Sequence, residues 1–184
     1  MRIAIVHDWL DTWAGSEQAL THILSLYPGA TLFALVDFLA PEHRARIPVE
    51  RIHTTFIQHL PWARTAFRRY LPCFPMAIER LDLSGFDLVI SSSHAVAKGA
   101  PTRAGQLHVC YCYTPMRYAW DLQEQYLEQT GLNHGLPGWI TRRALARLSA
   151  WDCRASAFCR QHSSVRLPMV PVPPPWCWWI IMAR

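Results

Sequence analysis

The stretch Met1-Arg-Ile-Ala-Ile-Val-His-Asp-Trp-Leu-Asp-Thr-Trp-Ala-Gly-Ser-Glu17 decides the fold of this chain. Residues 3–6 are an unbroken apolar run, which is typical of a strand buried on both faces of a parallel sheet. We therefore expect the central strand of an α/β domain here. Apolar residues then recur at the spacing of one helix face, at Leu20, Ile23, Leu24 and Tyr27. This pattern predicts a helix on the sheet that ends at Pro28-Gly29.

The loop 13–17 joins the predicted strand to the predicted helix, and its small residues are Ala14, Gly15 and Ser16. A loop of small residues before a helix N-terminus leaves backbone N–H groups free to face an anion. Gly15 and Ser16 are therefore the first candidates for the edge of a binding cleft.

Four more segments have the apolar or β-branched content of strands: 30–36, 51–56, 86–90 and 106–112. Together with the first strand they predict an α/β fold, a Rossmann-like parallel sheet with helices on both faces. The segment 138–154 predicts a basic amphipathic helix, with Ile140, Ala144, Leu148 and Trp151 on one side and Arg143, Arg147 and Arg154 on another. Such a helix packs on the domain or lies on a membrane.

Ligands of open parallel sheets gather beyond the carboxyl ends of the strands, where the strand order reverses. We expect three loops to meet there, around Gly15, around residues 91–98 and around residues 113–120. The serines 91–93 predict an N-cap for a following helix, which would place His94 and Lys98 on one face.

Composition limits the classes of protein to consider. A chain of 184 residues, 51% hydrophobic and 17% charged, fits one globular domain with a tail. The net charge of +5 comes almost entirely from arginines, which points to anionic ligands or anionic lipid and does not single out nucleic acid. The cysteines have neither metal-ligand spacing nor a disulfide framework, so we expect reduced thiols and no metal. Before the tail no apolar run reaches eighteen residues, and no signal-peptide core precedes the first strand, so we expect a cytoplasmic location.

Arginines and aromatic residues alternate between residues 60 and 80. Trp62, Arg64, Arg68 and Arg69 predict a patch for peripheral contact with a membrane surface. The alternative is that the aromatic rings of this segment enter the core while its arginines are solvated.

A nicotinamide-binding protein is another alternative, because Asp37 follows the second strand. The pattern G-x-G-x-x-G is absent and Gly15 stands alone, so Asp37 is expected to be a residue of the strand end or turn.

Four motifs carry a resemblance to a known family: Val6-His-Asp-Trp-Leu10, Gly15 with Glu17, Phe86-Asp-Leu-Val-Ile-Ser-Ser-Ser-His-Ala-Val-Ala-Lys-Gly99, and Thr114-Pro-Met-Arg-Tyr-Ala-Trp-Asp121. Over residues 1–156 the chain resembles the N-terminal half of the family 4 (group 1) glycosyltransferases, especially bacterial mannosyltransferases of polysaccharide and O-antigen assembly.

The resemblance implies a GT-B fold and transfer of a sugar from a nucleotide-sugar with retention, without a metal or other cofactor. It implies GDP-mannose as the donor and a lipid-linked or polysaccharide acceptor held by the N-terminal domain. Gly15 matches the loop glycine near the donor phosphate and acceptor. His94 and Lys98, and then Arg117 and Tyr118, match motifs that line the cleft.

Two positions depart from the family pattern. The family usually has two glycines where this chain has Ala14-Gly15. Tyr113 stands where relatives usually carry a histidine, and a phenol with a pKa near 10 stays neutral where an imidazole can carry charge. The catalytic residues are therefore not assigned from the sequence.

The pattern of the sequence changes after residue 154. We expect a domain over 1–154 and an irregular tail over 155–184, rich in proline and tryptophan, where the family would continue into a C-terminal domain. A frameshift near residue 153 explains this change, and a tail that anchors to a partner or membrane is the alternative. The functional expectation is an acceptor-side glycosyltransferase half that is inactive alone. The alternative is a non-catalytic glycan- or membrane-binding module.

Overall fold

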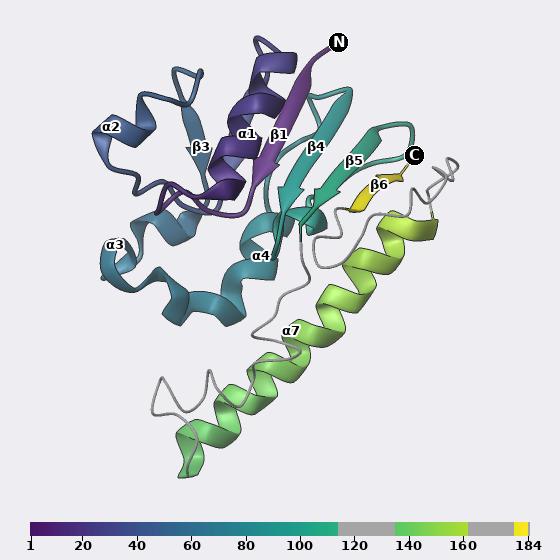
Figure 1. The fold of residues 1–184 in the computed structure, drawn as a ribbon. Helices are drawn as coiled ribbons and strands as arrows, with labels where there is room; N and C mark the ends of the chain where they lie inside the picture. The colour runs from purple at the N-terminus through teal and green to yellow at the C-terminus, as the bar shows by residue number, and fades with distance from the viewer. Residues whose placement is uncertain (114–134, 162–178, 184) are drawn as a thin grey trace, which may run out of the picture.

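The computed structural model describes the backbone of residues 1–113, 135–161 and 179–183, and the side chains of residues 1–113 and 142–155 (Figure 1). Its elements are β1 (Ile3–His7), α1 (Gly15–Leu26), β2 (Thr31–Ala34), α2 (Pro41–Arg44), β3 (Ile52–Thr54), η1 (Phe56–His59), α3 (Ala63–Ala66), η2 (Phe67–Cys73), α4 (Phe74–Glu79), β4 (Leu88–Ser93), η3 (Ala97–Gly99), β5 (Leu107–Cys112), α7 (Gly135–Gln161) and β6 (Trp179–Ala183).

One sheet organises these elements in the order β3-β2-β1-β4-β5-β6. The first five strands are parallel, and β6 runs antiparallel to β5. From β1 the chain adds β2 and then β3 on one side of β1, and β4 and β5 follow on the other side of β1. The strand order therefore reverses between β1 and β4, and the expectation of a Rossmann-like parallel sheet is confirmed.

Apolar side chains of β1 are buried on both faces of the sheet. Ala4 and Val6 belong to one hydrophobic cluster and Ile5 to another. Leu20 and Leu24 of α1 pack in the cluster of Ile5, whereas η2, α4 and α7 contribute to the opposite cluster. Helices thus cover both faces, as the unbroken apolar run predicts (Figure 1).

The helix α1 ends where the sequence predicts. Its last residue is Leu26, and Gly29 follows at φ 90°, a left-handed conformation that glycine adopts without steric cost. At the other end, Glu17 Oε2 accepts a hydrogen bond from the Ala14 N–H at 2.9 Å. This bond satisfies one of the N–H groups that a helix start leaves without an intrahelical partner.

The serines 91–93 differ from the prediction, because they lie inside β4 and are fully buried. No α-helix follows them; after a bend, the chain forms only the short 3₁₀ turn η3. The physical reason is that the Asp8 carboxylate accepts the backbone N–H groups of residues 94–97, which holds this segment as a loop. The expected helix face shared by His94 and Lys98 is therefore wrong.

The predicted basic amphipathic helix is confirmed in α7. Leu145, Leu148 and Trp151 are buried against the domain, while Arg143, Arg147 and Arg154 are exposed. The helix packs on η3, and Gly99 permits this contact because a Cβ there would lie 2.7 Å from Trp151 Cη2. The expected face also included Ala144, which is half-buried, and Ile140, whose side chain lies outside the described residues.

The helix α7 continues to Gln161, past residue 154 where the sequence predicts the end of the domain. Within the expected irregular tail, β6 pairs with β5. The segment 162–178 and residue 184 lie outside the described residues.

Candidate functional site at the carboxyl edge of the sheet

Buried polar side chains gather at the carboxyl ends of β1 and β4, where the strand order reverses. His7, Asp8, Ser91, Ser92 and Ser93 are all fully buried there. Burying a polar group is costly unless it is hydrogen-bonded. A cluster of this size at the edge where parallel sheets bind ligands is therefore the first candidate for a functional site.

A chain of hydrogen bonds joins the ends of β1, β4 and β5 to the first turn of α1 at this edge. His7 Nδ1 lies 3.0 Å from Ser92 Oγ, which lies 2.8 Å from the Tyr113 hydroxyl. The Tyr113 hydroxyl donates to the Ser16 carbonyl oxygen at 3.2 Å. Burial raises the pKa of Tyr113 more than its bond to Ser92 lowers it, so the phenol stays protonated, as expected from the sequence.

Asp8 fixes the loop that carries His94. Its two carboxylate oxygens accept the N–H groups of residues 94–97 at 2.6–2.8 Å, and its Oδ2 lies 3.0 Å from His94 Nδ1. Burial would raise the pKa of Asp8, but His94, the amide groups and His7 together lower it below its usual value. The buried carboxyl group is therefore ionised at neutral pH.

Glu17 adds a second buried carboxylate to the cluster. Its Oε1 lies 3.4 Å from His7 Nε2, and Ser16 Oγ donates to both of its oxygens. Burial would raise the pKa of Glu17, but the bond to His7, the charge of that ring and the Ala14 N–H lower it below the usual value. The first turn of α1 is thereby tied to β1.

The structure brings together four of the predicted site residues. Ser16 is bonded to Tyr113, the rings of Tyr113 and His94 lie 6.4 Å apart, and Gly15 precedes Ser16. Lys98 points elsewhere, because its Nζ lies 2.6 Å from Asp152 Oδ1 on α7 and both side chains are buried. Arg117 and Tyr118 lie outside the described residues.

Sequence reasoning gave no role to Asp8, His7 or Glu17 and only a helix-capping role to Ser92, although all four are in the motifs quoted above. The sequence signal that could have identified them is that they are polar residues directly after or inside a buried strand, where water cannot satisfy their hydrogen-bonding groups. Their partners are up to 89 positions away in the chain, as for Asp8 and Ala97, so the pairing follows only from the sheet order.

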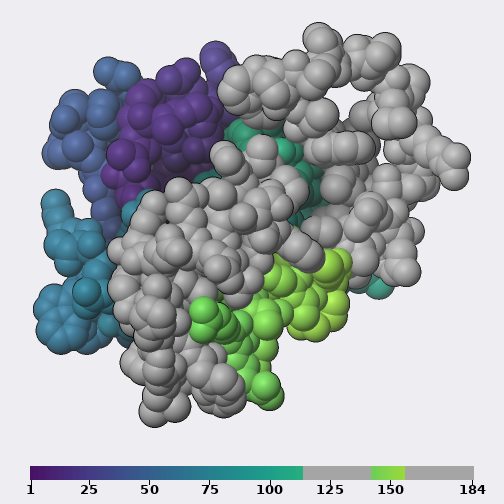
Figure 2. All heavy atoms as spheres, turned by 60° about the horizontal axis from the view of Figure 1, so that its bottom comes forward, coloured from purple at the N-terminus to yellow at the C-terminus, as the bar shows by residue number. Residues whose placement is uncertain are grey.

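The segment expected to form a membrane patch divides into three environments. Trp62 is 77% exposed and Arg64 and Arg69 are exposed, whereas Phe67 and Leu71 enter the core. Arg68 turns towards the site: its Nη2 donates to Asp11 Oδ2 at 2.7 Å, and its guanidinium lies 5.8 Å from the ring of Trp9. The segments containing α1 and α3 lie on the same face in Figure 2.

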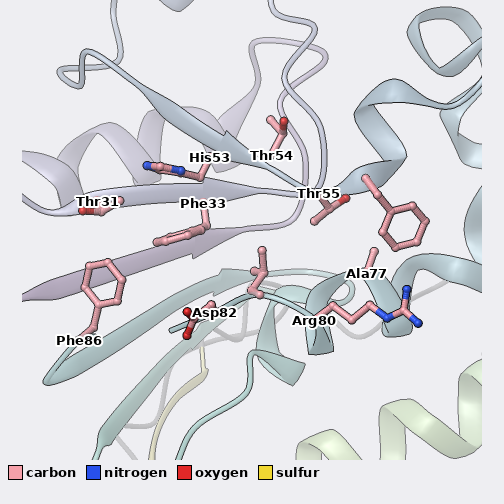
Figure 3. A pocket seen from close by; sticks show the side chains of 11 residues that line it. Thr31, Phe33, His53, Thr54, Thr55, Ala77, Arg80, Asp82 and Phe86 are labelled. Atoms are coloured by element: carbon pink, nitrogen blue, oxygen red, sulfur yellow. The ribbon is translucent and has the colours of Figure 1, made fainter. Parts of the chain in front are cut away.

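A hollow of about 640 Å³ lies away from this edge, on the flank of β2 and β3 (Figure 3). Phe33 stacks on His53 and meets Phe86 edge to face in its wall, and Arg80 lies on the opposite side. It contains none of the predicted site residues, so the carboxyl edge remains the candidate site.

The expectations about metal sites, cysteines, membrane spans and Asp37 can be compared with the described residues. They contain no cluster of three or more histidine, cysteine or acidic side chains suited to a metal, and Cys73, Cys110, Cys112 and Cys153 are free thiols. None of the described helices combines the length and apolarity needed to cross a bilayer. Asp37 forms an ion pair with Arg44, whose Nε lies 3.4 Å from Asp37 Oδ2, and this agrees with the expected role of Asp37 at the strand end.

His108 should make the stability of the fold sensitive to mild acid. Its Nε2 lies 2.8 Å from Ser91 Oγ, and burial lowers its pKa from 6.5 to about 4. Between these values the unfolded chain binds a proton that the folded chain does not, so stability is present above pH 6.5 and is lost as the pH falls towards 4. We expect His108→Gln to reduce the loss between pH 7 and pH 5 by about 2 kcal/mol.

Urea unfolding at pH 7 and pH 5 measures this difference. His22→Gln is the control, because His22 is exposed on α1 and its replacement should leave the pH dependence unchanged. Equal pH dependence in the wild-type chain and His108→Gln contradicts the prediction.

Fold and site together define an α/β protein of the Rossmann-like type, with a buried polar network at the reversal point of its sheet. No known protein-family model, curated protein or solved structure matches the chain.

Proposed function

We propose that this chain forms the acceptor-side domain of a glycosyltransferase. In this proposal the enzyme transfers a sugar, with mannose the best candidate, from a nucleotide-sugar such as GDP-mannose to a lipid-linked or polysaccharide acceptor. The observation that carries the proposal is the meeting of Gly15, His94 and Tyr113, which come from three distant segments, at the edge where the strand order reverses.

The surroundings of Gly15 support a ligand at this edge. Gly15 is exposed, its φ is not positive, and a Cβ built on it would meet no atom within 4 Å. The fold therefore does not require glycine there, whereas a ligand that approaches the backbone does. The amide N–H groups of Gly15 and Ser16 lie in the first turn of α1, where a phosphate or sugar oxygen can accept from them.

Binding and transfer assays with the purified chain test the proposal. We expect a mannose-containing lipid-linked glycan to bind, and no transfer from GDP-mannose by this chain alone, because in this proposal the chain supplies one wall of the cleft and transfer needs groups on both sides of the scissile bond. Gly15→Gln should fold normally and weaken glycan binding. Ser25→Gln, at the exposed far end of the same helix, should change neither.

Two outcomes contradict parts of the proposal. Unchanged glycan binding by Gly15→Gln removes the loop from the site, and binding of NADH in place of the glycan points to a different class of Rossmann-like protein. Glycan binding that no companion domain converts into transfer supports the non-catalytic module.

We also propose a cytoplasmic location with peripheral contact at the inner membrane. The exposed Trp62, Arg64 and Arg69 support such contact, as does the arginine-rich outer face of α7. Vesicles with anionic lipid should retain the chain at low salt and release it at high salt.

A further inference from the structure

An aromatic surface forms the floor of the hollow on the flank of β2 and β3 (Figure 3). Phe33 of β2 and His53 of β3 are register neighbours, and their rings stack with centroids 5.1 Å apart and 28° between the planes. Phe86 meets the ring of Phe33 edge to face, with centroids 5.6 Å apart. Aromatic rings packed in this way present a surface suited to another flat ring.

The hollow stays open because the elements around it are short. The strand β3 has three residues and is the edge strand on this side of the sheet, and the helix α4 ends at Glu79. Residues 80–82 then form the opposite wall without regular secondary structure. The volume of about 640 Å³ lies within the range typical of small-molecule sites, about 300–1,000 Å³.

Arg80 brings a positive charge to this wall. Its side chain is exposed, and no described residue forms a hydrogen bond or an ion pair with it. Asp82 is close in sequence, but its Oδ1 accepts the Ser84 N–H at 3.1 Å instead. A planar guanidinium with its N–H groups available is suited to bind a carboxylate or a phosphate through two parallel hydrogen bonds.

The aromatic surface and the positive charge lie at different ends of the hollow. In Figure 3, Phe33 and Phe86 lie at one end and the guanidinium of Arg80 lies at the other. Asp82 lies on the side of the rings, where its carboxylate repels an anion. A ligand with a flat ring and an anionic group therefore has one favoured orientation, with its charge towards Arg80.

We propose that this hollow binds a small molecule that combines a flat aromatic ring with one carboxylate or phosphate group. The ring packs against Phe33 and Phe86, and Arg80 binds the anionic group. This site is additional to the proposed function and does not rest on it, because none of the residues that line the hollow belongs to the polar cluster at the carboxyl edge of the sheet.

The probe is 2-naphthoate, which has a flat ring system and one carboxylate. Isothermal titration calorimetry of the full chain with this compound should show saturable binding at one site. The neutral analogue 2-naphthalenemethanol should bind more weakly, because it offers no charge to Arg80, and acetate, which has no ring, should not bind measurably. In ¹H–¹⁵N spectra, 2-naphthoate should shift the amide signals of Phe33 and His53 and leave those of Gly15 and Ser16 in place.

The variant Arg80→Gln tests the contribution of the charge. Because the side chain is exposed, the variant should fold normally, and the loss of charge-assisted hydrogen bonds should weaken 2-naphthoate binding about tenfold. Binding of 2-naphthalenemethanol should not change. The matched control is Arg64→Gln, which removes an exposed arginine outside the hollow and should leave the binding of both compounds unchanged.

Three outcomes overturn the proposal. They are the absence of saturable 2-naphthoate binding, equal affinity of the wild-type chain and Arg80→Gln for this compound, and shifts at Gly15 and Ser16 without shifts at Phe33 and His53. The last result places the compound at the carboxyl edge of the sheet. None of them decides the proposed function, because glycan binding is tested separately with Gly15→Gln.

Discussion

Replacing Asp8 with alanine is expected to lower the free energy of unfolding by about 3–5 kcal/mol, because it leaves several buried N–H groups without an acceptor. The amides of Ala95, Val96 and Ala97 are buried, and each donates to Asp8 at 2.7–2.8 Å. A loss of this size is a large part of the total stability of a typical domain. Urea unfolding at pH 7, followed by circular dichroism, measures it.

Asp11→Ala is the matched control. Asp11 lies in the same loop after β1 but pairs with Arg68, whose side chain is 57% exposed, so its loss should cost less than about 1 kcal/mol. The low pKa of Asp8 adds a second observable: its stabilisation is present at neutral pH and is lost as the pH falls through the lowered pKa of the folded chain. Equal destabilisation by Asp8→Ala and Asp11→Ala would falsify this assignment.

The five parallel strands could be predicted from the sequence because their signals are local, whereas β6 lies in the segment that was expected to be irregular. Each buried strand is a short apolar run that needs no partner to be recognised, and residues 3–6 and 106–112 fall within two residues of β1 and β5. The first helix was predictable for the same reason, since its apolar spacing and Pro28-Gly29 define its face and its end.

The polar network was not predictable, because its signals are not local. Three serines after an apolar run usually cap a helix, but here they extend β4, since Ser91 and Ser92 face His108 and His7 across the sheet. The role of Asp8 in holding residues 94–97 depends on β1 and β4 being neighbours, which sequence spacing alone does not give.

Arg68 and Lys98 show that a charge pattern does not identify the partner of a charged side chain. Both were expected on functional surfaces, one on a membrane patch and one in the cleft. The first remains exposed while it pairs with Asp11 beside Trp9, whereas the second is buried against α7 and not in the cleft. Each side chain pairs with a carboxylate that the fold brings close, and in both cases that carboxylate is more than 50 residues away in the sequence.

Lys98→Met is expected to destabilise the chain by about 3–5 kcal/mol, because it leaves the buried carboxylate of Asp152 without its cation. The side chains of Lys98 and Asp152 are only 3% and 5% exposed, and Nζ lies 2.6 Å from Oδ1. Burial would lower the pKa of Lys98, but the charge of Asp152 and its hydrogen bond raise it above the usual value, so Lys98 is charged at neutral pH.

The double variant Lys98→Met/Asp152→Leu tests whether the destabilisation comes from losing the ion pair itself or from leaving one buried charge without its partner. Replacing both partners of a buried ion pair with apolar side chains of similar volume is often nearly neutral. We therefore expect the double variant to recover most of the stability that either single variant loses, and Arg154→Met, on the exposed face of the same helix, to change it by less than about 0.5 kcal/mol. Losses that simply add in the double variant contradict this account, because the two side chains would then act independently. Hydrogen exchange in residues 145–155 locates the effect, since α7 should open first when its ion pair with η3 is broken.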